Sequence, residues 1–287
     1  MNKIIILLGQ RVRSGTNFVG STIAQHPDVM TIPPDRSFGE FNLFTDDTIV
    51  SGVYNKVIAK SFASGIREED LSSFLKRYGV CWMDLIIEKF KIPENKNIFI
   101  KSPDISHADL WKQAFPEARI ALICRDGRDN VISSVKASND KKTWHSAWTN
   151  LKRRLNYFSG RSFVNHSRMW NLTAKKILKL NLEPGFMLFK YESLLNSEEQ
   201  IGRLLDYFNL QTSPEIVKKC LDAPIVGSSF GGGEKGKFKS KWESDHRKEK
   251  YQFTNKWNGW GLLKKVVFKR IAGKSLIDLE YESDGNW

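Results

Sequence analysis

The sequence predicts an α/β protein, a three-layer α/β/α sandwich built on a central parallel sheet. Two observations predict this class: four short apolar runs have the pattern of buried strands, and helical patterns alternate with them. The chain has 287 residues, of which 40% are hydrophobic, and this composition is sufficient for a sizeable core. We expect one domain that spans residues 1–287.

Each expected strand is followed by an expected helix. The strands are Ile4–Leu8, Asn97–Ile100, Arg119–Cys124 and Phe186–Phe189. The helices that follow them are Asn17–Gln25, His107–Ala114, Asp126–Ser138 and Glu198–Phe208. Ligands of parallel α/β sheets bind at the carboxyl ends of the strands, so functional residues are expected directly after each strand.

Two longer stretches, about 41–91 and 136–180, interrupt this alternation and have mainly helical patterns. They are rich in aromatic and basic residues, and we expect these helical insertions to shape a groove for an acceptor molecule. The alternative is that the aromatic side chains pack the helices onto the sheet. The aromatic residues concerned are Trp82, Trp144, Trp148, Tyr157, Phe158 and Trp170. A last helix over Trp260–Ile271 is expected to lie on the domain.

The chain carries a formal net charge of +13, and the charge is concentrated near the C-terminus. Between Lys235 and Lys274 there are thirteen Lys or Arg residues against three acidic residues. Such an excess favours an anionic partner, which could be a phosphorylated cofactor, an acidic glycan, nucleic acid or a membrane surface. A solvated basic face without a partner is the alternative.

Three cysteines, Cys81, Cys124 and Cys220, lie far apart and lack metal-ligand spacing, which favours a reducing compartment. Cys124 lies in an apolar run and is expected to be buried. No stretch approaches the roughly 20 apolar residues that a membrane span needs. The short apolar run at residues 4–8 is too short for the core of a signal peptide. We therefore expect a cytoplasmic protein without a membrane span.

The first strand runs into the segment Gly9–Phe18, which has the composition of an anion-binding turn. A strand, a turn of small residues and a helix together bring free backbone N–H groups and the positive end of the helix dipole to one place. Gly15 allows the backbone to approach a phosphate closely. The residues expected to hold the anion are Arg13, Ser14, Gly15, Thr16, Asn17 and Phe18.

A nucleotide triphosphatase is the nearest competitor, but its loop needs a lysine directly before the last Ser or Thr. Gly15 stands at that place here. Arg13-Ser14-Gly15-Thr16 instead resembles the 5′-phosphosulfate loop of the sulfotransferase family, especially the branch of tyrosylprotein and Golgi carbohydrate sulfotransferases. The resemblance implies a P-loop-like form of the fold and the cofactor 3′-phosphoadenosine 5′-phosphosulfate (PAPS), with PAP as product.

A second anion anchor is expected after the third strand. Asp126 is suited to cap the following helix, and Arg125 and Ser133 then converge on one small dianion. In the resembling family this pattern marks the 3′-phosphate site of PAPS. The alternative is that Arg125 pairs with Asp126 or Asp129 at the surface. Ala137 stands where the family often has a further Arg, which is a departure from its pattern.

Transfer of a sulfuryl group requires an in-line hydroxyl, a base and cations near the leaving oxygen, without a metal. Lys101 and Arg13 are the expected cations, and in the family a Lys at the end of this strand contacts the bridging oxygen. A solvent-facing Lys101 is the alternative. Pro103 occupies the place of the His base of cytosolic sulfotransferases. The tyrosylprotein branch instead implies Glu40 as base, with Asp35 second and His107 third.

Two further residues follow from the resemblance. Tyr191 matches a family Tyr near the adenine and the 3′-phosphate, and its alternative is a half-buried Tyr at a strand end. Lys256 matches a late lysine near the nucleotide phosphates, and Lys241 fits the same signal.

The sequence thus predicts a sulfotransferase that acts on a hydroxyl. A glycan, with an anionic glycan included, is favoured as acceptor over a tyrosyl residue or a small alcohol. The rival functions are an atypical P-loop kinase or triphosphatase, and a non-enzymatic basic module for glycans or nucleic acid. The motifs disfavour nucleic acid as a partner.

Overall fold

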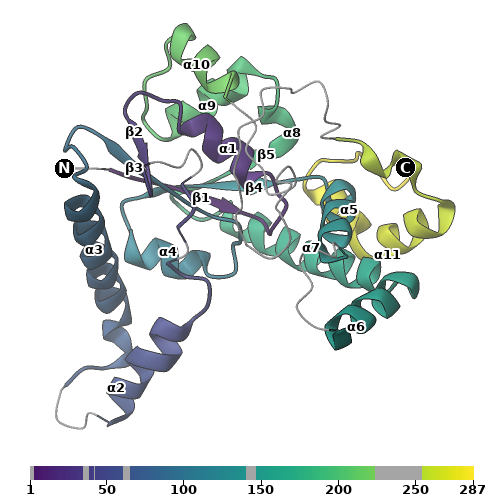
Figure 1. Ribbon diagram of the computed structural model, residues 1–287, viewed down its shortest axis with the longest axis horizontal. Coiled ribbons are helices and arrows are strands. Elements are labelled where there is room, and N and C mark those ends of the chain that lie inside the picture. Colours follow the sequence, from purple (N-terminus) through teal and green to yellow (C-terminus); the bar gives the residue numbers. More distant parts are fainter. Residues whose placement is uncertain (1–2, 35–38, 42, 61–64, 140–146, 224–253) are drawn as a thin grey trace.

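The computed structural model describes residues 3–34, 39–41, 43–60, 65–139, 147–223 and 254–287. Its centre is a five-stranded sheet with the strand order β2-β3-β1-β4-β5, in which every pair is parallel (Figure 1). The strands are β1 (Ile4–Gly9), β2 (Val29–Thr31), β3 (Asn97–Ser102), β4 (Arg119–Cys124) and β5 (Phe186–Lys190). The predicted α/β class is confirmed. The sequence patterns missed β2, because three residues at a sheet edge are too short to show a periodicity.

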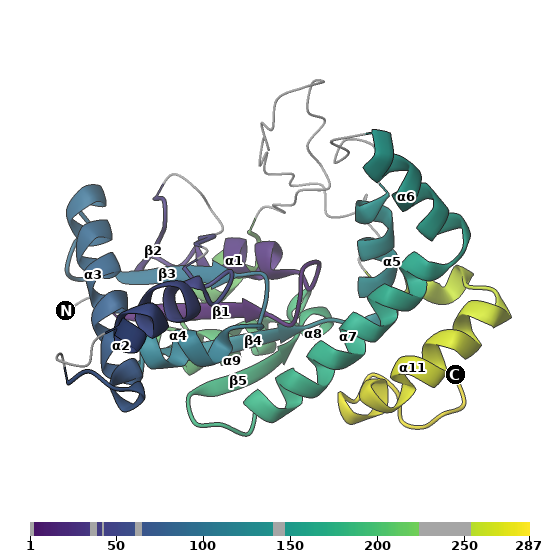
Figure 2. The same ribbon diagram turned by 90° about the horizontal axis from the view of Figure 1, so that it is seen from below.

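Helices cover both faces of the sheet, as the two views of the ribbon show (Figures 1 and 2). Successive strand residues point to opposite faces, so Ile6 and Leu8 belong to one buried cluster and Ile5 and Leu7 to the other. The first face packs against α3 (Leu71–Phe90), α4 (Ala108–Ala114), α7 (Arg161–Leu180) and α11 (Leu262–Asp278). The second packs against α1 (Thr16–Ile23), α9 (Glu198–Tyr207) and α10 (Pro214–Leu221). These are the three predicted layers.

The remaining described helices are α2 (Asn55–Lys60), α5 (Gly127–Ser138), α6 (Ala147–Phe158) and α8 (Tyr191–Leu194), with a π-helical turn at Ile49–Tyr54. Both predicted insertions are mainly helical where they are described. The C-terminal helix extends to Asp278, beyond the predicted end at Ile271, because Ala272 and Leu276 continue its buried face.

The aromatic residues of the insertions divide into two groups. Trp170 is fully buried and Trp82 packs against the same core, so these two rings fasten helices to the sheet. Tyr157 and Phe158 are exposed on α6. Trp144 and the side chain of Trp148 lie outside the described residues.

The free thiols of Cys124 and Cys220 are buried, as expected for Cys124, and Cys81 is exposed. Burial raises the pKa of Cys124 to about 12 and that of Cys220 to about 11, so both remain protonated near neutrality. Within the described ranges, none of the helices has the length and apolar character required to span a bilayer.

We predict that adding one methyl group at Gly127 destabilises the fold. A β-carbon there would lie 2.6 Å from the ring of Trp170, which is fully buried and has no room to move. Gly127→Ala should therefore lower the free energy of unfolding by about 1–3 kcal/mol, measured by urea denaturation. Gly202→Ala is the matched control, because no atom lies within 4 Å of its added carbon, and it should be neutral or slightly stabilising. Equal stability of the two variants would contradict this packing.

Candidate active site

The segment between β1 and α1 forms a tight turn with two residues in the left-handed region. Arg13 has φ 73° and Gly15 has φ 91°. The backbone N–H of Ser14 donates to the carbonyl of Arg11 at 3.2 Å, and the hydroxyl of Ser14 accepts from the N–H of Arg11 at 3.3 Å. A β-carbon on Gly15 would lie 2.2 Å from the ring of Tyr191. Gly15 is therefore required both by its φ and by the aromatic ring against it.

Gly15 is also the N-cap of α1, so the turn delivers the start of this helix to the strand edge. The first N–H groups of a helix have no acceptor within the helix, and its dipole places partial positive charge there. Thr16 and Phe18 are buried and Asn17 is half-buried in this first turn, which contains no acidic residue. The predicted strand–turn–helix arrangement is present, and it can hold an anion.

The second predicted anchor meets the first. The side-chain Nε of Arg13 donates to Oγ of Ser133 on α5 at 2.9 Å, and Nη1 of Arg125 donates to the carbonyl of Arg13 at 3.2 Å. The guanidinium of Arg125 lies over the ring of Tyr191, 4.9 Å from its centre. Residues predicted from three separate strand ends thus form one continuous cluster. Ala137, where the family often has an Arg, is half-buried on α5.

Positive charges crowd at this cluster. Lys256 lies on a short helical turn, where its backbone N–H donates to Oδ1 of Asp129 at 2.8 Å. Burial lowers the pKa of Lys256, and the charge of Arg125 lowers it further. Burial and the charge of Arg125 also lower the pKa of Arg13. Burial and the charge of Arg125 therefore disfavour the charged forms of Lys256 and Arg13, an effect that a bound anion would oppose. Lys241, the alternative to Lys256, lies outside the described residues.

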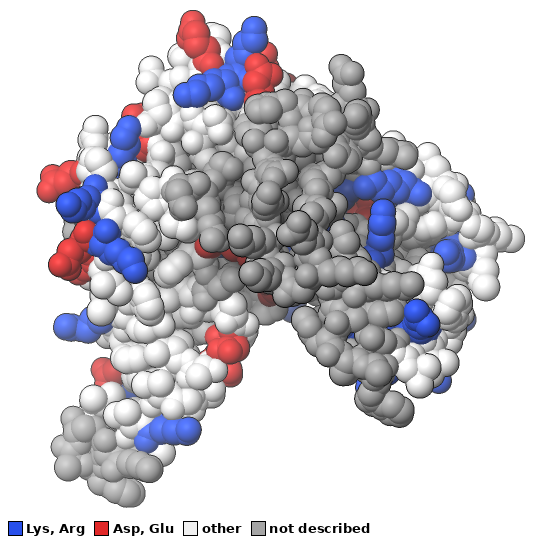
Figure 3. Space-filling view, viewed as in Figure 1, with Lys and Arg blue, Asp and Glu red and all other residues white. Residues whose placement is uncertain are grey.

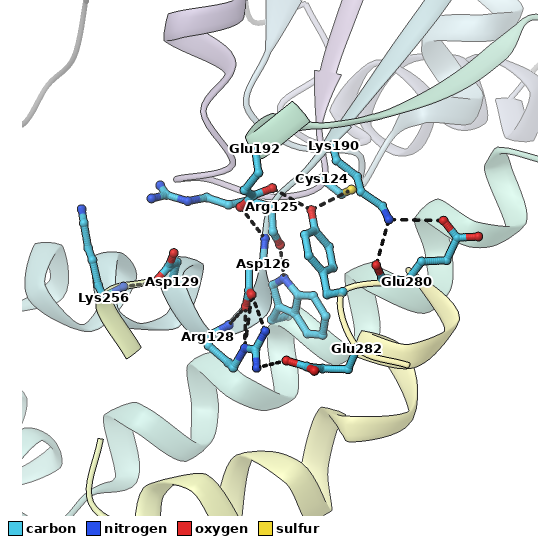
Figure 4. A network of polar contacts seen from close by, with 12 residues as sticks. Cys124, Arg125, Asp126, Arg128, Asp129, Lys190, Glu192, Lys256, Glu280 and Glu282 are labelled. Atoms are coloured by element: carbon cyan, nitrogen blue, oxygen red, sulfur yellow. Dashed lines mark hydrogen bonds and ion pairs between the residues drawn. The ribbon is translucent and has the colours of Figure 1, made fainter. Parts of the chain in front are cut away.

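Arg128 lies three residues after Arg125, and its side chain makes contacts within the protein (Figure 4). Its guanidinium pairs with Asp126, with Nη2 2.6 Å from Oδ2, and it also contacts Glu282. The same group stacks on Trp257, 3.7 Å from the ring centre. Asp126 accepts from the N–H of Arg128 at 2.8 Å and is the predicted N-cap of α5. Arg128 thus fastens the turn that carries Lys256 to the start of α5.

A carboxylate holds the backbone next to Arg125. Oε1 of Glu192 accepts from the N–H of Asp126 at 3.0 Å, and Oε2 accepts from the hydroxyl of Tyr281 at 3.0 Å (Figure 4). The thiol of Cys124 lies 3.3 Å from the same hydroxyl. Burial raises the pKa of Glu192. The C-terminal segment thereby buttresses the tip of β4.

The two catalytic candidates Lys101 and Glu40 are in contact. Nζ of Lys101 lies 2.7 Å from Oε2 of Glu40, and the Lys101 side chain is fully buried whereas that of Glu40 is 30% exposed. The N–H of Lys101 donates to the carbonyl of Gly39 at 2.8 Å, which pairs the two segments as a short bridge. Burial lowers the pKa of Lys101, and Glu40 opposes this shift. The alternative of a solvent-facing Lys101 is wrong.

Of the other two candidate bases, His107 lies within the described residues. His107 occupies the N-cap position of α4, where its carbonyl accepts from the N–H of Leu110 at 3.1 Å. Asp35 lies outside the described residues.

Asn130 supports the loop and was missed in the sequence. Its Nδ2 donates to the carbonyl of Val12 at 3.3 Å and lies 3.5 Å from the hydroxyl of Ser14. Ser134 donates in turn to Oδ1 of Asn130 at 3.3 Å. The sequence contains a pattern that could have indicated this role of Asn130. A polar stripe at helical spacing runs along the expected helix 126–138, and it consists of Asn130, Ser133 and Ser134.

A histidine distant in sequence holds the other side of the loop. Nη1 of Arg11 donates to the carbonyl of His166 at 2.8 Å, and Nη2 lies 3.1 Å from Nδ1 of its ring. The hydroxyl of Ser138 lies 3.0 Å from Nε2. Burial, followed by the charge of Arg11, lowers the pKa of His166 to about 4. His166 is therefore neutral near neutral pH, and no local pattern reveals this contact.

We predict that His166 makes the fold sensitive to acid. Its pKa is about 4 in the folded chain against an ordinary 6.5, so the unfolded chain binds more protons between these values. This contribution to stability is complete above the ordinary pKa and is lost as the pH falls towards 4. His166→Gln keeps polar contacts but cannot titrate. Its melting temperature should fall less than that of the parent chain between pH of about 7.5 and about 5. An identical fall would overturn the assignment.

The comparisons with known proteins identify relatives of this fold. The sequence profile described as the sulfotransferase family matches residues 5–214, which reach from β1 to the start of α10. The sulfotransferase domain of the olefin synthase of Synechococcus PCC 7002 is similar in structure, with a TM-score of 0.51 and 13% identity. That alignment covers 95% of this chain and 94% of the other.

The sulfotransferase domain from the curacin biosynthetic pathway has a TM-score of 0.54 and 18% identity, with 98% of this chain and 99% of the other covered. A mouse sulfotransferase complexed with PAP is also found, with a TM-score of 0.48, 12% identity, and 97% and 85% of the two chains covered. Comparison with curated protein sequences found no match. At these identities the two likenesses with a TM-score above 0.5 establish a shared fold.

Proposed function

The chain belongs to the sulfotransferase family, an enzyme family, and we propose that it moves a sulfuryl group from PAPS to a hydroxyl of an acceptor. One observation carries the choice of cofactor. The carbonyl of Arg13 accepts from Arg125 while the side chain of Arg13 donates to Ser133, so two anion anchors share one place. A nucleotide with phosphate groups at both its 5′ and 3′ positions fits such a pair, whereas one phosphate would use only one anchor.

The residues present fit this cofactor. The absence of a side chain at Gly15 lets the loop pack against the ring of Tyr191, and burial and the charge of Arg125 lower the pKa of Arg13 and of Lys256, a shift that a bound anion would oppose. Burial raises the pKa of Tyr191 to about 12, so its hydroxyl remains a neutral donor. When bound, PAPS supplies the sulfuryl group and its phosphate leaving group.

Each group of residues has a proposed task. The 5′-phosphosulfate would be held by Arg13, Ser14, Gly15, Thr16, Asn17 and Phe18. The 3′-phosphate side would be held by Arg125, Ser133, Tyr191 and Lys256. Arg13 acts in both binding and catalysis, because its guanidinium also counters charge on the transferring group.

The Lys101–Glu40 pair is the proposed catalytic centre. Glu40 accepts the proton of the acceptor hydroxyl, and the ammonium of Lys101 counters the negative charge that grows on the leaving oxygen. The buried end of Lys101 holds the carboxylate 2.7 Å away, so the base has a defined position. The turn at Pro103 brings this pair beside the loop, since a β-carbon on Gly9 would lie 2.8 Å from the Pro103 carbonyl.

For the acceptor we propose a glycan, with an anionic one favoured. The exposed Lys136 lies on α5 one turn beyond Ser133, and its charge acts on Lys256 together with that of Arg13. Positive charge thus extends from the cofactor cluster towards the solvent. The likeness of the loop and of Gly39-Glu40 to the tyrosylprotein and Golgi carbohydrate branch supports a macromolecular hydroxyl. Tyrosyl peptides and small alcohols belong in the same acceptor screen.

We predict selective binding of the bisphosphate nucleotide. PAP should raise the melting temperature of the chain more than ATP or GTP with Mg²⁺, since only PAP has both phosphate positions. Arg13→Ala and Arg125→Ala should each weaken PAP about 10- to 100-fold by calorimetry, the value of a lost charge-assisted hydrogen bond. Arg77→Ala, an exposed Arg on α3, is the control with the same change of charge and should bind normally. Preferential stabilisation by ATP or GTP would favour the kinase or triphosphatase instead.

We predict that Glu40→Gln separates catalysis from binding. The amide still accepts a hydrogen bond from Lys101 but cannot take a proton, so kcat should fall about 100- to 10,000-fold with PAP affinity unchanged. The assay follows labelled sulfate from PAPS onto pooled glycans, tyrosyl peptides and alcohols. Glu88→Gln, at an exposed position of α3, is the control and should keep full activity. Full kcat in Glu40→Gln would assign the base elsewhere.

A further inference from the structure

The helices α6, α7 and α11 lie together at one end of the molecule, where α7 and α11 also pack on one face of the sheet (Figure 2). We call residues 147–180 and 262–278 the helical lobe. Helix α7 packs against both α6 and α11. The ring of Phe163 in the first turn of α7 meets Trp260 with ring centres 5.1 Å apart. The end of α6 and the start of α11 therefore lie at the same end of the lobe.

The helical lobe is strongly basic. Residues 147–180 contain eight Lys or Arg and no Asp or Glu, and residues 262–278 contain five against the single acid Asp278. Figure 3 shows basic residues almost alone over this end, whereas both signs are mixed at the opposite end. The proposed cofactor site uses none of these Lys and Arg residues.

The same lobe exposes large apolar side chains. Phe158 is 82% exposed, Leu262 79% and Leu263 77%. Phe158 and Leu262 each lie within a few residues of the Phe163–Trp260 contact, so they occupy one region. The other exposed large apolar side chains of the helical lobe are Leu151, Leu155, Tyr157, Met169, Leu172 and Val266. Of the sixteen such side chains among the described residues, nine belong to this lobe, which indicates a surface that is covered in use.

We propose that the helical lobe docks on an anionic lipid bilayer. Leu262, Leu263 and Phe158 enter the boundary between headgroups and acyl chains, while neighbouring basic residues such as Lys264 and Arg270 contact lipid phosphates. Exposed apolar groups among cations are what such an interface needs. The proposal uses none of the residues that are proposed to hold the cofactor.

The positive charge and the exposed apolar side chains of the helical lobe together favour an anionic bilayer over a polyanion and over a second copy of the chain. A polyanion such as RNA or a sulfated glycan would satisfy the cations but would leave the leucines in water. A second copy of the chain would bury the leucines but would place two strongly basic faces against each other, which is unfavourable. An anionic bilayer satisfies both features.

The test is co-sedimentation of the full chain with phosphatidylcholine vesicles that contain or lack phosphatidylglycerol. Binding is expected only with the anionic vesicles, and it should weaken as salt is added. The double variant Leu262→Ser, Leu263→Ser should bind at least about tenfold more weakly. The matched control is Val80→Ser, Leu85→Ser on α3, where both side chains are 50% exposed, and it should bind as the parent does. Lys264→Glu with Arg270→Glu should also abolish most of the binding.

Each contrary result overturns the proposal. Absence of binding to anionic vesicles does so directly, provided that PAP still stabilises the protein and the chain is folded. If the variant Leu262→Ser, Leu263→Ser binds anionic vesicles as the parent does, and RNA or heparin binds equally well, the lobe is a polyanion site. Self-association in sedimentation velocity that the leucine variant abolishes assigns this face to an interface between copies.

Discussion

Parallel pairing brings the carboxyl ends of β1, β3, β4 and β5 to the same side of the sheet. Leu8 pairs with Ser102, Gly9 with Ile123, and Cys124 with Lys190. A shift by one residue would turn every buried apolar side chain to the opposite face, so this register is strongly determined. The loop, Lys101, Arg125 and Tyr191 are neighbours for this reason, although they come from distant parts of the chain.

Nearby carboxylates orient the backbone around the cluster of cations, and their charges also act on Arg125 and Lys256. Asp129 accepts from the N–H of Lys256, and Glu192 accepts from the N–H of Asp126. Burial raises the pKa of both carboxyl groups. Arg128 carries the main ion pairs with Asp126 and Glu282 and is itself stacked on Trp257. Arg13 and Arg125 meet beside these groups at the strand ends, which supports the proposed site for a doubly phosphorylated nucleotide.

The molecule uses its excess of positive charge in two physically different settings. At the strand ends Arg13, Lys101 and Arg125 are buried or half-buried and Lys256 is exposed, and burial lowers the pKa of Arg13 and Lys101. On the helical lobe Lys264 and Arg270 are exposed and interleaved with apolar side chains. The first setting suits a small anion that is enclosed by donors, and the second suits an extended anionic surface. The total charge alone does not distinguish these settings.

The sequence by itself determined four of the strands, the helices that follow them and the two segments that are proposed as anion anchors, because hydrophobic periodicity and turn chemistry are local properties. Only the tertiary structure decided that Lys101 pairs with Glu40, that His166 holds Arg11, and that Arg128 fastens the C-terminal segment. It also decided the edge strand β2, which exists through its pairing with β3. These contacts depend on which distant segments pack together, and that choice follows from burial of the whole core, which no single window of residues contains.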